Sequence, residues 1–202
     1  MPKSYRLGEL LETNDHLVVD SSVVCGEYPD RQLGERYMNN FSDLTRISRK
    51  FKTTREVIGE IRNGIEHPHY ELRQRCLFRA FNDRTDKHLG ILYRTVRSYL
   101  KDSAEEDGLT HHNKSFPEAD LSVASLSLTF AHLSDRKVAV LSNDSFLNDF
   151  ILRALREARE SEYDNGFPFM LRSRVDIFYL EHENMKFKRH ISRSKRRLAS
   201  AV

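Results

Sequence analysis

The chain has 202 residues, of which 39% are hydrophobic and 31% charged, with 12 Phe, 8 Tyr and a formal net charge of +3. This length suits one domain, and the aromatic content can build a core, which excludes wholesale disorder. No run of 18 apolar residues occurs, so a membrane-spanning helix is excluded.

The first strand is predicted at 16–19, a short buried apolar run that ends at Asp20. Residues 1–15 before it are interpreted as an N-terminal extension. The extension has no apolar core of the signal-peptide kind, so export is not expected. A polar helix is expected at about 33–49, and residues 51–53 are expected to be extended.

A second helix is predicted to follow residue 53. Thr53 and Glu56 have the spacing of a capping box, and Pro68 is expected to end the helix. Glu60 then lies about two turns from the helix start. The apolar residues share one face at helical period: Val57, Ile58, Ile61 and Ile65.

Residues 70–106 are charged and are predicted to form a helical hairpin beside the sheet, within an insertion of about 70–113. A further helix is expected after Pro117 because its apolar residues recur on one face. Asp120 lies in the first turn of this helix, where the helix dipole favours a carboxylate.

The last elements are a buried strand at 138–141, a helix at about 146–161, and strands at 167–171 and 175–180. Strands that alternate with helices predict an α/β fold. We expect a three-layer α/β/α sandwich around a mainly parallel sheet, with the folded domain at 16–185.

The end of the chain is strongly basic. Seven of the 33 basic side chains lie in 186–202 with no acid, so residues 1–185 carry 26 basic and 30 acidic side chains. This pattern predicts a basic tail that meets a polyanion, and a solvated tail without a partner is the alternative. The residues expected to bind nucleic acid are Lys188, Arg189, Arg193, Lys195, Arg196 and Arg197.

Two predicted strands end alike, in Asp20-Ser21-Ser22 and in Ser142-Asn143-Asp144. The carboxyl ends of neighbouring parallel strands meet at one crevice, and Glu60 and Asp120 follow on helices. Four carboxylates at one place repel unless protons or a cation neutralise them. Because oxygen-only ligands suit Mg²⁺ or Mn²⁺, the pattern predicts a divalent-metal site.

These segments resemble the PIN-domain ribonucleases. The resemblance rests on LVVDSSVV at 17–24, TTREVIGEI at 53–61, EADLSVASLSL at 118–128 and VLSNDSFL at 140–147. It implies an acidic quartet, with Ser22 and Ser142 as supporting hydroxyls and with Asp20, Asp120 and Asp144 as the metal ligands. The four quartet residues are Asp20, Glu60, Asp120 and Asp144.

The resemblance implies a divalent-metal-dependent endoribonuclease that hydrolyses single-stranded RNA and leaves 5′-phosphate and 3′-hydroxyl ends. As partners it suggests RNA, a second copy of the chain, and either an antitoxin-like inhibitor or an RNA-processing complex. Two cysteines without a CxxC motif indicate a cytoplasmic protein.

Other interpretations stay open. Asp20 and Asp144 could serve solely as caps of the helices that follow them. Asp120 could serve solely to complement a helix dipole, and Glu60 could be a surface acid beside Arg62. The domain would then be a catalytically inactive RNA-binding or scaffold protein of the same fold. A phosphatase or nucleotide-binding domain is disfavoured because neither strand is followed by a glycine-rich phosphate loop.

Overall fold

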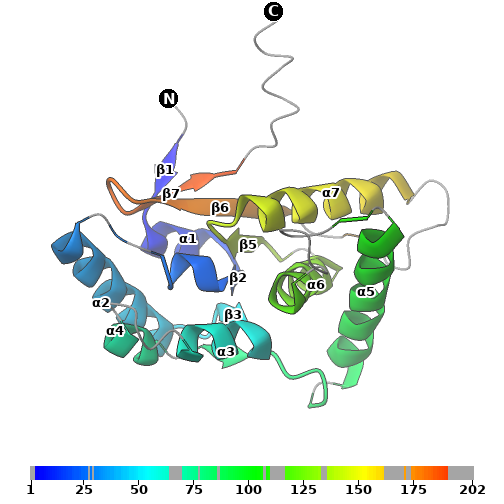
Figure 1. Ribbon diagram of the computed structural model, residues 1–202, viewed down its shortest axis with the longest axis horizontal. Helices are drawn as coiled ribbons and strands as arrows, with labels where there is room; N and C mark the ends of the chain where they lie inside the picture. Colours follow the sequence, from blue (N-terminus) through cyan, green and yellow to red (C-terminus); the bar gives the residue numbers. More distant parts are fainter. Residues whose placement is uncertain are drawn as a thin grey trace, which may run out of the picture.

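A seven-stranded sheet forms the centre of the computed structural model, with strand order β1-β7-β6-β5-β2-β3-β4 (Figure 1). The structure describes residues 3–26, 28, 30–63, 70–76, 78–85, 87–106, 108–109, 117–132, 136–161, 171 and 174–190. The strands are β1 (Ser4–Tyr5), β2 (His16–Val19), β3 (Phe51–Thr53), β4 (Arg79–Ala80), β5 (Val138–Leu141), β6 (Val175–Glu181) and β7 (Lys186–Arg189).

Five neighbouring strands, β4-β3-β2-β5-β6, are parallel, whereas β7 is antiparallel to both β6 and β1. If these five strands are numbered 1 to 5 in chain order, starting at β2, their order across the sheet is 3-2-1-4-5. The direction of winding therefore reverses between β2 and β5. In open α/β sheets, ligands bind outside the carboxyl ends of the strands at such a reversal.

Helices cover both faces of the sheet, which confirms the predicted three-layer α/β/α sandwich. In Figure 1, α1 and α2 lie to the left of the sheet, and α5 and α6 lie to its right. None of the described helices combines the length and apolar character needed to cross a bilayer. The helices are α1 (Leu7–Thr13), α2 (Arg31–Ile47), α3 (Arg55–Asn63), α4 (Tyr70–Gln74), α5 (Lys87–Glu106), α6 (Glu118–His132) and α7 (Ser145–Ser161), with a 3-10 turn η1 (Ser21–Val23).

Helix α6 is the central helix of the fold. All of its residues from 119 to 131 are buried, as expected for a helix that packs on several sides. It contacts β2, β5 and β6 on the sheet and α3, α5 and α7 beside it. Its buried hydroxyls donate to carbonyls one turn earlier, for example Ser127 Oγ to Val123 O at 2.7 Å. Small, internally bonded side chains thus let α6 carry Asp120 deep into the molecule.

The start of α3 differs from the predicted capping box. Thr53 lies in β3, and its hydroxyl donates to Val19 O of β2 at 2.7 Å. The cap is Thr54, whose Oγ1 accepts from Val57 N at 3.4 Å. The capping box of Thr53 with Glu56 was therefore wrong by one residue, because sheet pairing takes Thr53 into the strand.

The predicted helical hairpin over 70–106 is also wrong in its first half. Helix α4 is short, and the chain then forms β4, which pairs in parallel with β3 through Lys52↔Arg79 and Thr53↔Ala80. Only the second half is a long helix, α5, which packs against α6. The part of 70–106 that the structure describes therefore supplies an edge strand of the sheet as well as helices.

Both ends of the described chain belong to the same sheet. β1 pairs with β7, and α1 buries Leu7 and Leu10 in the common core. The expected boundaries after residues 15 and 185 therefore fall between neighbouring elements of one folded unit. The predicted strand at 167–171 lies outside the described residues except for Leu171, which is not in a strand.

Candidate functional site

The carboxyl ends of β2 and β5 form the floor of the candidate site. The two strands pair in register up to Val19↔Leu141, so Asp20 and Ser142 are the next residues on each strand. Asp20 N donates to Leu141 O at 3.0 Å, which extends the pairing to the aspartate itself. This register places Asp20 beside the segment that leads into α7.

Asp20 is a buried carboxylate, with 3% of its surface exposed. Its Oδ2 accepts from Ser142 Oγ at 2.9 Å, from Ser22 N at 3.3 Å, and from the Ser22 hydroxyl. Burial raises the pKa of Asp20, while the hydrogen bonds from Ser22 and Ser142 oppose that rise. Ser22 and Ser142 thus both contact Asp20, and their supporting role in a metal site stays a prediction.

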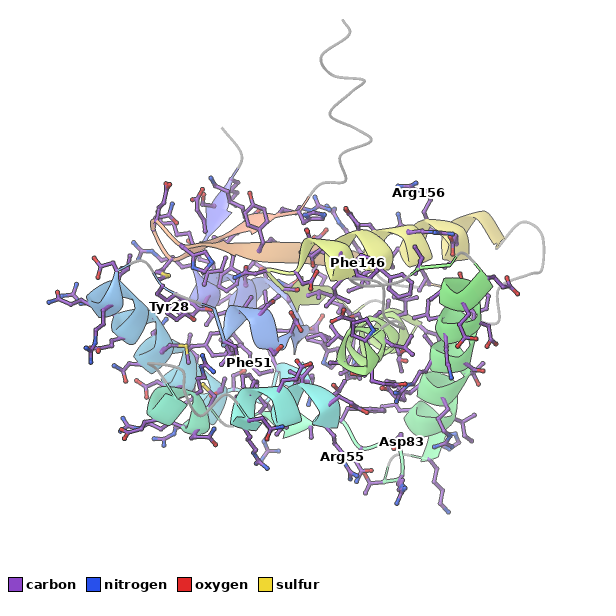
Figure 2. All side chains as sticks on the ribbon, in the orientation of Figure 1. Tyr28, Phe51, Arg55, Asp83, Phe146 and Arg156 are labelled. Carbon is purple, nitrogen blue, oxygen red and sulfur yellow. The ribbon has the colours of Figure 1, made fainter. Side chains whose placement is uncertain are left out.

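The two serines also hold the neighbouring segment. Ser142 Oγ accepts from Asp144 N at 3.0 Å, and Ser22 Oγ accepts from Asn143 N at 2.8 Å. Asp144 is the cap of α7, and its Oδ1 accepts from Phe146 N at 2.7 Å and Leu147 N at 3.1 Å. Figure 2 labels Phe146 at the start of this helix. Asp144 can therefore cap α7 and also belong to the candidate site.

Glu60 reaches the site from α3. Its Oε2 accepts from Ser21 Oγ at 2.6 Å, which joins α3 to the turn that follows Asp20. Partial burial and the charge of Asp20 raise the pKa of Glu60, whereas the bond from Ser21 lowers it. The nearby Glu56 instead pairs with Arg97 at 3.6 Å. Glu60 is therefore the acid that α3 contributes.

Asp120 is affected by all three of the other carboxyl groups. Its pKa is raised to about 7, first by burial and then by the negative charges of Asp20, Asp144 and Glu60. The start of α6 should favour the ionised form. Desolvation and like-charge repulsion act in the opposite direction and raise the pKa. The four predicted acids therefore share one electrostatic environment.

The donor chemistry of this site fits a hard dication. It consists of carboxylates and hydroxyls, the ligand types that Mg²⁺ and Mn²⁺ prefer. As placed, however, no three His, Cys, Asp or Glu side chains of the described residues are grouped closely enough to hold one ion. Hydrogen bonds hold Asp20 to Ser22 and Ser142, Glu60 to Ser21, and Asp144 to the first backbone N–H groups of α7. Ion binding would therefore require the other three carboxylates to turn toward Asp20, which the two serines hold in place.

The sequence did not predict the contacts of four residues that assemble the site. Ser21 binds Glu60, and Asn143 Oδ1 accepts from Leu180 N of β6 at 2.7 Å. Thr54 Oγ1 lies 2.6 Å from Ser122 Oγ, which joins the start of α3 to the first turns of α6. The polar triplets that follow β2 and β5 indicated that Ser21 and Asn143 lie near the site. Their hydrogen-bond partners, Glu60 and Leu180, are distant in the sequence and could not be identified from it.

The basic residues expected to bind nucleic acid divide into two groups. Lys188 and Arg189 lie in β7, where they form ion pairs with Glu181 and Asp176 of β6. Arg193, Lys195, Arg196 and Arg197 lie outside the described residues. At the start of α3, Arg55 is exposed and lies at the outer edge of the molecule (Figure 2).

The chain was compared with protein-family models, with curated proteins and with solved structures. No protein-family model matches the chain, and no curated protein or solved structure matches it. Any inference about function therefore depends on the residues and geometry described above.

Proposed function

We propose that this chain is a divalent-metal-dependent endoribonuclease that hydrolyses phosphodiester bonds of single-stranded RNA. The observation that carries the proposal is geometric: the paired carboxyl ends of β2 and β5 place Asp20 beside Ser142 and the segment of Asp144, and Ser21 joins Glu60 of α3 to the same turn. The pKa of Asp120, raised to about 7 by burial and by the charges of the other three acids, agrees with this grouping. The three acids that raise the pKa of Asp120 repel its ionised form, and a cation bound among them would relieve that repulsion. The resemblance of the four segments to PIN-domain ribonucleases supports the same assignment.

In the proposed reaction Asp20, Asp120 and Asp144 hold Mg²⁺ or Mn²⁺, and Glu60 orients the attacking water. Once bound there, such an ion would supply Lewis-acid polarisation of the phosphate and of the departing oxygen. A new bond forms between the water oxygen and phosphorus as the bond to the 3′-oxygen breaks, and the proton that the water loses is balanced by one gained by the 3′-oxygen. The products are a 5′-phosphate and a 3′-hydroxyl. Ser22 and Ser142 keep Asp20 in position through their hydrogen bonds.

The helix starts near the site support an anionic substrate. Asp120 lies in the first turn of α6, and Asp144 caps α7. The positive ends of both helix dipoles are therefore next to the acids. A phosphate group would be attracted there once a cation has neutralised the carboxylates.

A second candidate is a non-catalytic RNA-binding or scaffold protein of the same fold. It is favoured by one observation: within the described residues, the acids are not already grouped as ligands of one ion. If the hydrogen bonds of Ser21, Ser22 and Ser142 hold the carboxylates apart even when metal is present, no cleavage would occur.

An RNA cleavage assay with matched variants tests the proposal. The wild type should cut a labelled single-stranded RNA in Mn²⁺ or Mg²⁺ and not in EDTA. Asp20→Asn and Asp144→Asn should reduce the rate about 100-fold or more, because each removes a charged metal ligand while retaining an oxygen acceptor. Asparagine also caps helices well, so Asp144→Asn should stay folded.

Asp43→Asn is the control because it makes the same chemical change on the exposed surface of α2. It should cut at the wild-type rate. Equal cutting by the wild type, Asp20→Asn and Asp144→Asn would contradict the site assignment. A folded wild type that cuts no RNA with either metal would favour the non-catalytic candidate.

The proposal includes a cytoplasmic location and RNA as the partner. Cys25 and Cys76 are both free thiols, as expected for a reducing compartment. A second copy of the chain and an antitoxin-like inhibitor or RNA-processing complex are proposed as protein partners on the resemblance alone.

A further inference from the structure

Arg73 is a buried cation without an anionic partner in the described part of the chain. Only 1% of its surface is exposed, although it lies in the short helix α4. Its Nη2 donates to Cys25 O at 3.4 Å, a long contact with a neutral carbonyl. Its Nε is buried and donates to no described residue. A buried guanidinium is costly unless an anion accepts its hydrogen bonds.

A cavity of about 120 Å³ lies beside this guanidinium. Arg73, Arg62 and Gln74 supply polar groups to its wall, and Ile58, Ile61 and Phe78 supply apolar ones. Arg62 and Gln74 are exposed, so they lie on the solvent side of the cavity, whereas Arg73 is inside. Two guanidinium groups around one small cavity are suited to a planar or tetrahedral oxyanion.

The cavity adjoins the acidic site through shared elements. Helix α3 lines it with Ile58 and Ile61, and the same helix presents Glu60 to Ser21. On the other side, Arg73 contacts Cys25 O, and Cys25 N donates to Ser21 O at 2.7 Å. The guanidinium is therefore connected by consecutive contacts to the turn that follows Asp20.

We propose that Arg73 and Arg62 bind a phosphate group of the RNA strand in this cavity, next to the acidic site. The identification of RNA as the carrier rests on the function proposed above, whereas the affinity for a phosphate group rests on the cavity itself. A negative group here would complete the hydrogen bonding of Arg73 Nε and would hold the strand across α3. Burial lowers the pKa of Arg73, which agrees with a guanidinium that lacks an anion.

Binding measured without catalysis tests this proposal. A fluorescent single-stranded RNA with hydroxyl ends is titrated with the protein in EDTA, and the anisotropy is recorded. Arg73→Met should weaken binding about 10-fold and Arg62→Gln about 3-fold, because a charge-assisted phosphate contact is lost in each. Arg36→Gln, which removes an exposed charge on α2, is the matched control and should bind as the wild type does.

A second measurement, made on the wild type and then on Arg73→Met, tests whether a phosphate group is the ligand. The melting temperature of the wild type should rise in millimolar inorganic phosphate relative to chloride at equal ionic strength, since a ligand of the folded state stabilises it. Arg73→Met should show no such rise. Phosphate stabilisation with unchanged RNA affinity in both arginine variants would overturn RNA as the carrier.

Unchanged RNA affinity and no phosphate stabilisation would overturn the site altogether. If Arg73→Met does not fold, Arg62→Gln and the phosphate melt of the wild type still decide the outcome. Because these measurements are made without metal, they are independent of cleavage. A protein that loses RNA affinity in Arg73→Met but never cuts RNA would retain this site and contradict only the nuclease.

Discussion

Asp120 shows how the fold forces a conflict on a single residue. Its position in the first turn of α6 favours a negative charge, but α6 is buried and three other acids lie near its start. The result is a pKa of about 7, against a usual value near 4 for aspartate. At neutral pH without metal, ionised Asp120 therefore destabilises the folded protein.

The sign of the pH dependence follows from this pKa. Between about pH 4 and pH 7 the folded chain keeps a proton on Asp120 that the unfolded chain has lost. The free energy of unfolding therefore falls as the pH rises through this window. Asp120→Asn removes the effect, so in EDTA it should be more stable than the wild type at pH 8 by about 2 kcal/mol, after allowance for screening. Urea denaturation at pH 4 and pH 8 measures the difference.

Two comparisons make this stability prediction specific. Asp43→Asn, on the exposed surface of α2, should follow the wild type at both pH values. Mn²⁺ should stabilise the wild type at pH 8 and have less effect on Asp120→Asn, because the ion relieves the repulsion that the variant lacks. A variant less stable than the wild type at pH 8 would show that Asp120 is not in conflict with its neighbours.

At the scale of elements, two glycines report on how tightly the helices near the site are packed. Gly59 lies inside α3, and a Cβ added there would meet no atom within 4 Å. Gly90 lies in α5, and a Cβ there would be 1.8 Å from Asp83 O. The same substitution should therefore have opposite effects in the two helices.

We expect Gly59→Ala to raise the free energy of unfolding by about 0.5–1 kcal/mol, because alanine is the better helix former and space is available. Gly90→Ala should lower it by about 1–3 kcal/mol, because the turn at Asp83 must move away from α5. Guanidinium denaturation of both variants measures these changes. Loss of stability in Gly59→Ala would show that the outer side of α3, beside Glu60, is covered.

Elements with a strong local signal could be predicted from the sequence. The buried runs at β2 and β5 were found at their observed bounds, and β6 was found to within one residue. In contrast, β4 has only two residues, Arg79 and Ala80, and neither is typical of a strand. Its conformation is set by pairing with β3, a tertiary contact that no local pattern records.

The same distinction applies to the candidate site. Asp20 and Asp144 were predicted because both follow buried strands, and parallel strands end at one edge of the sheet. The contact of Ser21 with Glu60 joins residues 39 positions apart, so it depends on how α3 packs against η1. The hydrogen bonds that hold the acids apart were not predictable either, because rotamers follow from the packed structure.

For the whole molecule, the basic residues in the sheet differ from those at the end of the chain, because those in the sheet have acidic partners. Lys188 and Arg189 were grouped with the basic tail, but in β7 they are neutralised by Glu181 and Asp176 across the strand pair. The remaining positive charges of that group are Arg193, Lys195, Arg196 and Arg197. Of the six basic residues predicted to bind nucleic acid, these four and not the two in β7 should therefore attract RNA.

Removal of residues 191–202 tests this division. The truncated chain should bind single-stranded RNA with a salt dependence lower by up to about 3 in the slope of log K against log salt, because each lost phosphate contact contributes about 0.7. The double variant Lys188→Gln/Arg189→Gln should retain most of the wild-type slope, since its charges already have acidic partners. Anisotropy titrations from 50 to 200 mM KCl, roughly the range over which such contacts are resolved, measure both. A larger loss of slope in the double variant than in the truncated chain would mean that RNA breaks the ion pairs of β7 and binds on the sheet edge instead.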